Sequence, residues 1–173
     1  HKSLLANASH ELRSPLARLR MGLELLGDVP PTPAARAELQ RNIAELDQLV
    51  EEILLASRLD ARDAELGAVG TVEPVDLVGL AAEECARVDA ELDVQAPPEA
   101  LELPGVARLL RRALRNLLEN ARRYSDGDIT VTLRRDGPWA EVRVADRGPG
   151  VPPDLRERIF EPFYRLPGAS ERA

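Results

Sequence analysis

A leucine repeat near the amino end constrains the fold more than any other feature of this 173-residue chain. Its apolar residues recur at alternating steps of three and four positions, with Ser9 in one polar slot: Leu5, Leu12, Leu16, Leu19, Leu23 and Leu26. This heptad period predicts one helix over residues 2–26 that packs its leucine stripe against another helix. In that register His10 falls at position b, which faces solvent. Pro15 lies inside the helix and predicts a bend just after His10.

A second helix is predicted over residues 34–60, after a loop at 27–33 that is rich in proline. Its apolar stripe contains Leu39, Ile43, Leu46, Leu49, Val50, Ile53 and Ala56. Two antiparallel helices bury only one seam between them, so the remaining apolar positions need another partner. A homodimeric four-helix bundle is the economical solution. The alternative is that both helices pack on the downstream part of the same chain.

A short polar motif on the first helix suggests chemistry. His10 is followed directly by Glu11, and Ser14 lies one turn further on the same face. An exposed imidazole can act as a nucleophile, and a neighbouring carboxylate can orient its ring and accept its proton. Taken alone, the pair also fits a solvated helix face that happens to carry one histidine.

The second half of the chain alternates between helical and strand patterns. Residues 61–75 lose the helical period, and Asp76 is a suitable N-cap for a helix over about 77–90. Short apolar runs near 92–94 and 101–103 are candidate strands, and a strong helical pattern covers 106–124. Alternating residues at 129–133 and 142–144 predict two strands joined by a turn at 136–138.

Two groups of residues in the second half of the chain have side chains suited to binding a nucleotide. Asn116, Glu119, Asn120 and Arg123 share one helix face, where side-chain oxygens suit Mg²⁺ and the cation suits a phosphate. A solvated face of mixed polar groups is the alternative interpretation. After the last strand, Asp-Arg-Gly-Pro-Gly at 146–150 places a carboxylate beside glycines that allow close approach of a flat ring.

In this order, the motifs resemble those of sensor histidine kinases. His-Glu-Leu-Arg-Ser-Pro-Leu at 10–16 resembles the phosphoacceptor box, with Ser14 where the family usually has Thr or Asn. Residues 116–124, 146–150 and 159–165 resemble the asparagine box, the first glycine box and the phenylalanine box. The resemblance implies catalytic roles for His10, Glu11 and Ser14, and Mg²⁺ ligation by Asn120 with Asn116 in support. It implies that ATP is bound by Asn116, Asn120, Arg123, Tyr124, Asp146, Gly148, Gly150, Phe160, Phe163 and Arg165.

The implied fold is an α+β multidomain chain. An antiparallel helical hairpin, dimerising into a four-helix bundle, precedes an incomplete α/β sandwich of the histidine-kinase, gyrase and chaperone ATPase type. The expected boundaries are 1–60 for the hairpin, 61–75 for a linker and 76–173 for the ATP-binding domain. The second glycine box is absent, so we expect the chain to stop within the ATP lid.

The implied function is ATP-dependent autophosphorylation of His10, followed by phosphotransfer to an aspartate of a response-regulator receiver domain, with a possible reverse phosphatase reaction. Two other hypotheses remain: an ATPase or chaperone of the wider superfamily, and a catalytically silent dimerisation scaffold. A net charge of -7 argues against a nucleic-acid partner. Without an apolar run of about 18 residues, we expect this piece to be cytoplasmic and to make no membrane contact. The longer protein would be an integral inner-membrane sensor.

Overall fold

The computed structural model describes residues 2–60, 70–161 and 164. The chain divides into two compact units, His1–Asp63 with Pro152–Ala173 and Ala64–Val151. Residues 61–69, which make up most of the predicted linker, lie outside the described residues. The domain boundaries expected at residues 60 and 75 therefore stay predictions. Among the helices of the described part, none is both long enough and apolar enough to cross a membrane.

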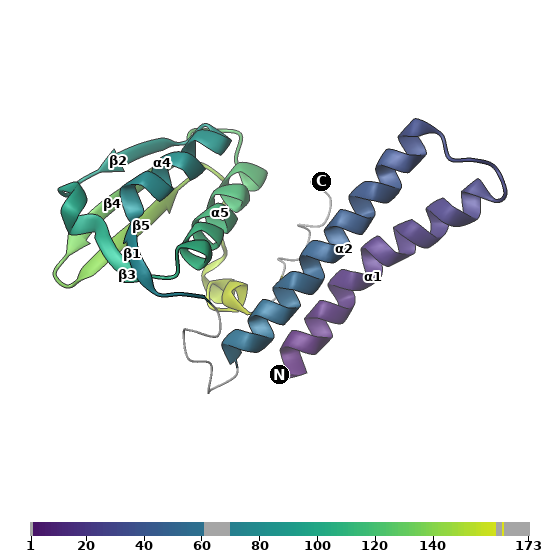
Figure 1. The fold of residues 1–173 in the computed structure, drawn as a ribbon, viewed down its shortest axis with the longest axis horizontal. Coiled ribbons are helices and arrows are strands. Elements are labelled where there is room, and N and C mark those ends of the chain that lie inside the picture. The colour runs from purple at the N-terminus through teal and green to yellow at the C-terminus, as the bar shows by residue number, and fades with distance from the viewer. Residues whose placement is uncertain (1, 61–69, 162–163, 165–173) are drawn as a thin grey trace. The chain divides into compact units, whose positions relative to one another are not determined.

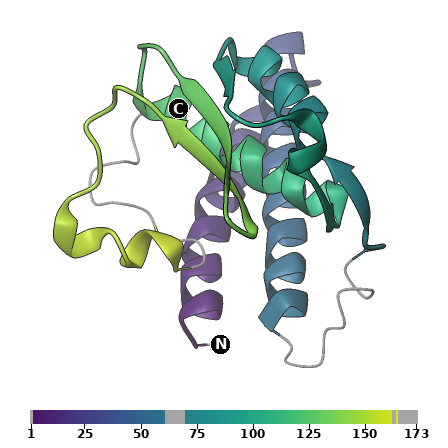
Figure 2. The same cartoon turned by 90° about the vertical axis from the view of Figure 1, so that its left-hand side faces the viewer.

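The amino-terminal helices form the predicted antiparallel hairpin, as Figure 1 and Figure 2 both show. Helix α1 spans Lys2–Leu26 and α2 spans Pro33–Asp60, close to the helices that the heptad period predicts. Helix α1 ends where Gly27 adopts a φ of +52°, a conformation that costs glycine little. Helix α2 begins after Thr32, whose hydroxyl accepts the Ala35 N–H at 3.1 Å, and Pro33 fits the first helical position.

The hairpin buries only part of its apolar stripe. Pro15 is less than 2% exposed, and α1 stays helical through it. Leu49 and Asn42 are buried on α2, whereas several large apolar side chains of the two helices remain about half exposed: Leu16, Leu23, Ile43, Val50 and Leu54. A pair of helices offers a single seam, so the residues on the flanks of the stripe have nothing to pack against within the hairpin.

The second unit contains the predicted helices and strands in order, and it also contains an additional strand at residues 73–76, where the linker was expected to continue to residue 75. Strand β1 (Glu73–Asp76) leads into helix α4 (Leu77–Val88), strand β2 (Glu91–Val94), a short 3₁₀ helix η1 (Pro98–Leu101) and strand β3 (Glu102–Gly105). Helix α5 (Ala107–Tyr124) follows, then strands β4 (Thr130–Asp136) and β5 (Trp139–Ala145). The Asp76 carboxylate accepts the Gly79 N–H at 3.1 Å, which confirms the predicted N-cap of α4. Two further 3₁₀ turns, η2 (Pro153–Leu155) and η3 (Arg158–Phe160), come after β5.

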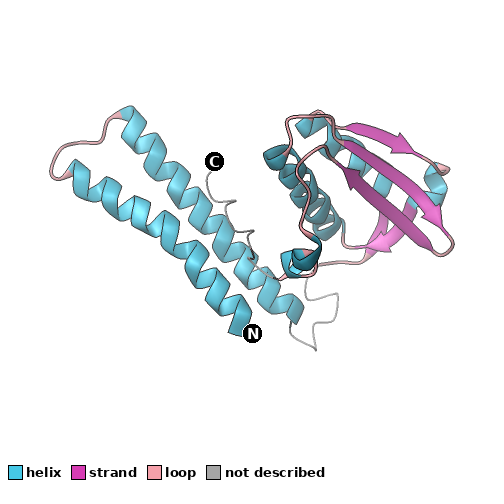
Figure 3. Ribbon diagram, turned by 180° about the vertical axis from the view of Figure 1, so that it is seen from behind, coloured by secondary structure: helices cyan, strands magenta, loops and turns pink. Residues whose placement is uncertain are grey.

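The strands make two small sheets. β1 pairs antiparallel with β3, while β4 lies between β2, which is parallel to it, and β5, which is antiparallel. Helices α4 and α5 cover the same face of the three-stranded sheet, as Figure 3 shows. Alternate residues of the β4 segment point into that layer and are at most 1% exposed: Ile129, Val131 and Leu133. This confirms the predicted helical hairpin followed by an α/β layer.

Helix α5 buries a narrower face than its sequence suggests. Leu114, Leu118 and Ala121 are buried in the core, but Leu117 is 50% exposed. The sheet and α4 can cover only the stripe that faces them, and Leu117 lies beyond its edge. The remaining surface of α5 is therefore open to solvent, and it is there that the predicted polar site residues lie.

Candidate functional site

The His10 side chain faces solvent on α1, as its heptad position predicts. Ala8, two residues before His10, is 3% exposed, and Pro15, five residues after it, is less than 2% exposed. At about 100° per residue both lie on the side of α1 opposite the imidazole, so the buried side of the helix faces away from His10. Glu11 is half-buried and Ser14 is exposed. The three predicted catalytic residues thus lie on one accessible stretch of α1, with the ring open to an incoming group.

Ser14 belongs to a hydrogen-bond cluster that the motif did not reveal. The Arg18 guanidinium donates to the Ser14 hydroxyl at 2.9 Å, to the Asn42 Oδ1 at 2.9 Å and to the Glu45 Oε2 at 2.5 Å. Asn42 is only 4% exposed, within the seam of the hairpin. Two signals pointed to this cluster: Arg18 lies four residues after Ser14, and Asn42 is a polar residue inside an apolar heptad stripe.

The predicted nucleotide residues on α5 do share one face. Asn116, Glu119, Asn120 and Arg123 are all exposed, and Tyr124 is half-buried at the carboxyl end of the helix. Within the described part of the chain, no hydrogen bond engages the side-chain amide of Asn116 or Asn120. Their oxygens are accordingly available to a hard cation at the surface of the helix.

The Asp146–Gly150 loop lies directly against the end of α5. A Cβ atom added to Gly148 would come within 2.8 Å of the Tyr124 carbonyl oxygen, so only glycine permits this approach. The Gly148 N–H donates to the Asp146 Oδ1 at 2.7 Å, which orients the exposed carboxylate, and Gly150 adopts a φ of +72°. The tertiary structure therefore brings the glycine loop against the carboxyl end of the helix that carries the asparagine face.

The aromatic segment is only partly described. Phe160 ends η3 with its side chain 83% exposed, so it does not pack into a small core of its own. Tyr164 is half-buried, and the Arg158 guanidinium carbon lies 4.8 Å from the centre of its ring. Phe163 and Arg165 lie outside the described residues.

A buried ion cluster fixes α5 on α4, and sequence reasoning missed it. Glu84 is 2% exposed on α4, and both its carboxylate oxygens accept from Arg115, at 2.9 Å and 2.7 Å. Arg111 adds a third bond at 3.1 Å. These bonds, above all those from Arg115, lower the pKa of Glu84 to about 2 despite its burial. Arg115 directly precedes Asn116, so the cluster also fixes the position of the start of the polar face relative to α4.

The donor set of this face fits Mg²⁺. The oxygens of Asn116 and Asn120 are hard ligands, and Mg²⁺ commonly takes one or two protein oxygens and completes its shell with water and substrate phosphates. Among the described residues, no group of three or more His, Cys, Asp or Glu side chains gathers into a cage. The face therefore suits a metal ion that arrives with a phosphate ligand, and Arg123 offers a charge for that ligand one turn away.

Two family models match the chain in sequence order. Residues 1–62 match the His Kinase A (phospho-acceptor) domain. Residues 105–173 match the histidine kinase-, DNA gyrase B- and HSP90-like ATPase domain. The first match contains His10, Glu11 and Ser14, and the second contains α5 and the Asp146 loop.

Curated relatives align over almost the whole chain. Sensor protein RstB of Escherichia coli K12 is 36% identical over 99% of this chain, which spans 40% of RstB. The signal transduction histidine-protein kinase/phosphatase MprB of Mycolicibacterium smegmatis is 38% identical over 96% of this chain, which spans 36% of MprB. The chain thus covers well under half of the length of either relative.

A solved structure shows the same fold. The histidine kinase ThkA, crystallised in complex with response regulator protein TrrA, superposes with a TM-score of 0.69 at 19% identity. The match covers 93% of this chain and 50% of ThkA. With both domain matches in this order and sensor kinases aligned along nearly its full length, the chain belongs to the sensor histidine kinases of two-component systems.

Proposed function

We propose that the protein autophosphorylates on His10 with ATP and passes the phosphoryl group to an aspartate of a response regulator. The observation that carries this proposal is the solvent-facing His10 imidazole, next to Glu11, on a hairpin that buries the other side of α1. A scaffold or a superfamily ATPase with conformational output needs neither of these two side chains in that position.

In the proposed reaction one ring nitrogen of His10 attacks the γ-phosphorus of ATP. The new N–P bond forms as the bond from that phosphorus to the β,γ-bridging oxygen breaks, and ADP leaves with the electron pair. Glu11 holds the imidazole and accepts the proton from the other ring nitrogen. Catalysis of this kind depends chiefly on positioning and charge neutralisation.

The nucleotide half of the proposal rests on α5 and the Asp146 loop. Asn120, supported by Asn116, would hold Mg²⁺, which would neutralise phosphate charge when bound. Arg123 would contact a phosphate, Tyr124 would line the adenine pocket, and the Asp146 carboxylate would accept from the adenine amino group. Gly148 and Gly150 leave room for the ring. The remaining proposed contacts are Phe160, Phe163 and Arg165, at the base of a lid.

The proposed protein partners bind the helical hairpin. We propose that a second copy covers the exposed apolar flank of the hairpin, and that a response-regulator receiver domain docks below His10. ThkA, which shares this fold, was crystallised in complex with a response regulator. Ser14 would position water for a phosphatase reaction. The relative MprB is named as a kinase/phosphatase. We further propose that this part of the protein lies in the cytoplasm, where ATP and receiver domains are found. An inner-membrane location for the whole protein stays a prediction.

The test is incubation of the full-length protein with γ-labelled ATP, comparing wild type with His10→Gln. We expect label in the wild type that is lost in acid and kept in base, which is typical of a phosphorylated nitrogen. The label should be nearly absent in the variant, because glutamine lacks the nucleophilic ring nitrogen that accepts the phosphoryl group. Undiminished labelling of His10→Gln would refute the proposal.

A matched variant separates chemistry from folding. Gln48 lies on the exposed face of α2, so Gln48→Ala changes a helix residue of the same hairpin without touching α1. It should label as the wild type does. Equal loss of label in both variants would mean that damage to the hairpin, not the imidazole, explains the result.

A further inference from the structure

Ser125 links the two halves of the proposed nucleotide site. It is the first residue after α5 and is only 6% exposed. Its hydroxyl oxygen accepts two backbone N–H groups, from Gly127 at 3.2 Å and from Arg147 at 3.3 Å. The second bond spans 22 positions of sequence and reaches the loop between Asp146 and Gly148.

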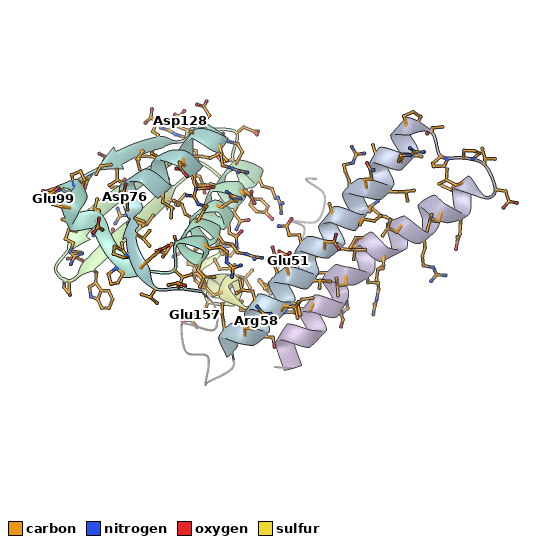
Figure 4. All side chains as sticks on the ribbon, viewed as in Figure 1. Glu51, Arg58, Asp76, Glu99, Asp128 and Glu157 are labelled. Carbon is orange, nitrogen blue, oxygen red and sulfur yellow. The ribbon has the colours of Figure 1, made fainter. Side chains whose placement is uncertain are left out.

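A second side-chain contact joins the two segments at the surface. It is the ion pair of Arg147 with Asp128, and of these two residues Figure 4 labels Asp128. The N–O distance is 3.8 Å, and both side chains are more than three-quarters exposed. Exposed ion pairs of this kind contribute little to stability. The Arg147 side chain also packs on Gly127, where an added Cβ would lie 3.2 Å from it. Of the side-chain bonds between the two loops, the one from Ser125 is the buried one.

The hydrogen bond between Arg147 and Ser125 joins the two segments that carry the proposed nucleotide-binding residues. The Arg147 N–H lies between Asp146, whose carboxylate is proposed to read the base, and Gly148, which touches the Tyr124 carbonyl. On the other side, Ser125 continues directly from the helix that carries Asn120. A hydroxyl that holds both segments sets the distance between the base-reading carboxylate and the metal-binding face.

We propose that Ser125 is a positioning residue for nucleotide recognition: it fixes Asp146 relative to Asn120 and so sets the preference for adenine. This inference rests on the proposed function. A carboxylate in that place accepts from the amino group of adenine but meets the carbonyl oxygen of guanine, which repels it. Loosening the loop should therefore weaken base discrimination, while phosphate and metal contacts on α5 persist.

The experiment measures ATP and GTP binding to the full-length protein by calorimetry, with Mg²⁺ present. Ser125→Ala leaves two N–H groups without their acceptor, and we expect ATP affinity to fall about tenfold, with GTP affinity nearly unchanged. Ser125→Thr keeps the hydroxyl and should restore most of the ATP preference. Asp76→Ala is the matched control, because it removes one side-chain acceptor of a backbone N–H in the same unit, at the other end of α4 from this loop.

A second measurement does not depend on nucleotide. Amide hydrogen exchange at Arg147 should speed up in Ser125→Ala and stay unchanged in Asp76→Ala. Unchanged exchange at Arg147, or an ATP-to-GTP ratio that stays as in the wild type or falls equally in Asp76→Ala, overturns the inference. A wild-type protein that binds neither nucleotide overturns the proposed function itself, and this inference with it.

Discussion

At the scale of single residues, Gly148 determines how closely the Asp146–Gly150 loop can approach the end of α5 in the proposed nucleotide site. An added Cβ would lie 2.8 Å from the Tyr124 carbonyl oxygen and 3.0 Å from the Asp146 carboxylate. Because the first of these is backbone, Gly148→Ala must shift the loop or the end of α5. We expect a loss of about 1–3 kcal/mol in the free energy of unfolding and weaker ATP binding, measured by urea denaturation and calorimetry.

Gly137 provides the control at the same scale. It has a φ of +56° in the β4–β5 turn, and an added Cβ would have nothing within 4 Å. Gly137→Ala should therefore cost about 1 kcal/mol through backbone strain alone and leave ATP affinity unchanged. If both variants weakened ATP binding equally, the contact between Gly148 and Tyr124 would not be what shapes the site.

At the scale of elements, the ion cluster around Glu84 makes the docking of α5 on α4 sensitive to pH. Its hydrogen bonds, chiefly from Arg115, hold the pKa of Glu84 at about 2 instead of 4.5. Because this pKa is lower in the folded state, ionisation of Glu84 stabilises the fold by about 3 kcal/mol relative to the protonated side chain. That stabilisation is complete above about pH 5 and is lost as the pH falls through 4.5 toward 2.

Glu84→Gln should therefore be less stable than wild type at pH 7, and the difference should shrink as the pH approaches 2, as urea denaturation at several pH values would show. Glu83→Gln is the matched control, because the neighbouring Glu83 side chain is 66% exposed where it pairs with Arg111. Its effect should stay below about 1 kcal/mol. A stability gap for Glu84→Gln that does not change with pH would contradict this explanation.

At the scale of the whole molecule, the exposed apolar flank of the hairpin predicts a dimer. Ile43 and Val50 lie seven residues apart on α2 and are 50% and 46% exposed. Ile43→Glu with Val50→Glu would place charges in a buried seam between two copies, so we expect a monomer by analytical ultracentrifugation. Leu25→Glu is the control, because Leu25 is 82% exposed and lies off the line of Leu16 and Leu23. A dimer that survives the double substitution would exclude this seam.

Local patterns in the sequence determined much of this molecule. Heptad spacing predicted both helices of the hairpin, and alternation predicted β4 and β5, because each period follows from the geometry of one element. The same rule placed His10 on the open side of α1 and put Asn116 and Asn120 on one face of α5. The roles of these residues stay predictions, although their exposure is confirmed.

Only the tertiary structure decided which residues meet across long stretches of sequence. The bonds from Arg147 to Ser125, from Arg18 to Asn42 and from Arg115 to Glu84 join residues 22, 24 and 31 positions apart. None of these pairs follows from a period, because a period fixes the face of one element but not the partner on which that face packs. Packing decided that the carboxyl end of α5 and the Asp146–Gly150 loop meet, where the buried Ser125 hydroxyl accepts the Arg147 N–H across 22 positions of sequence.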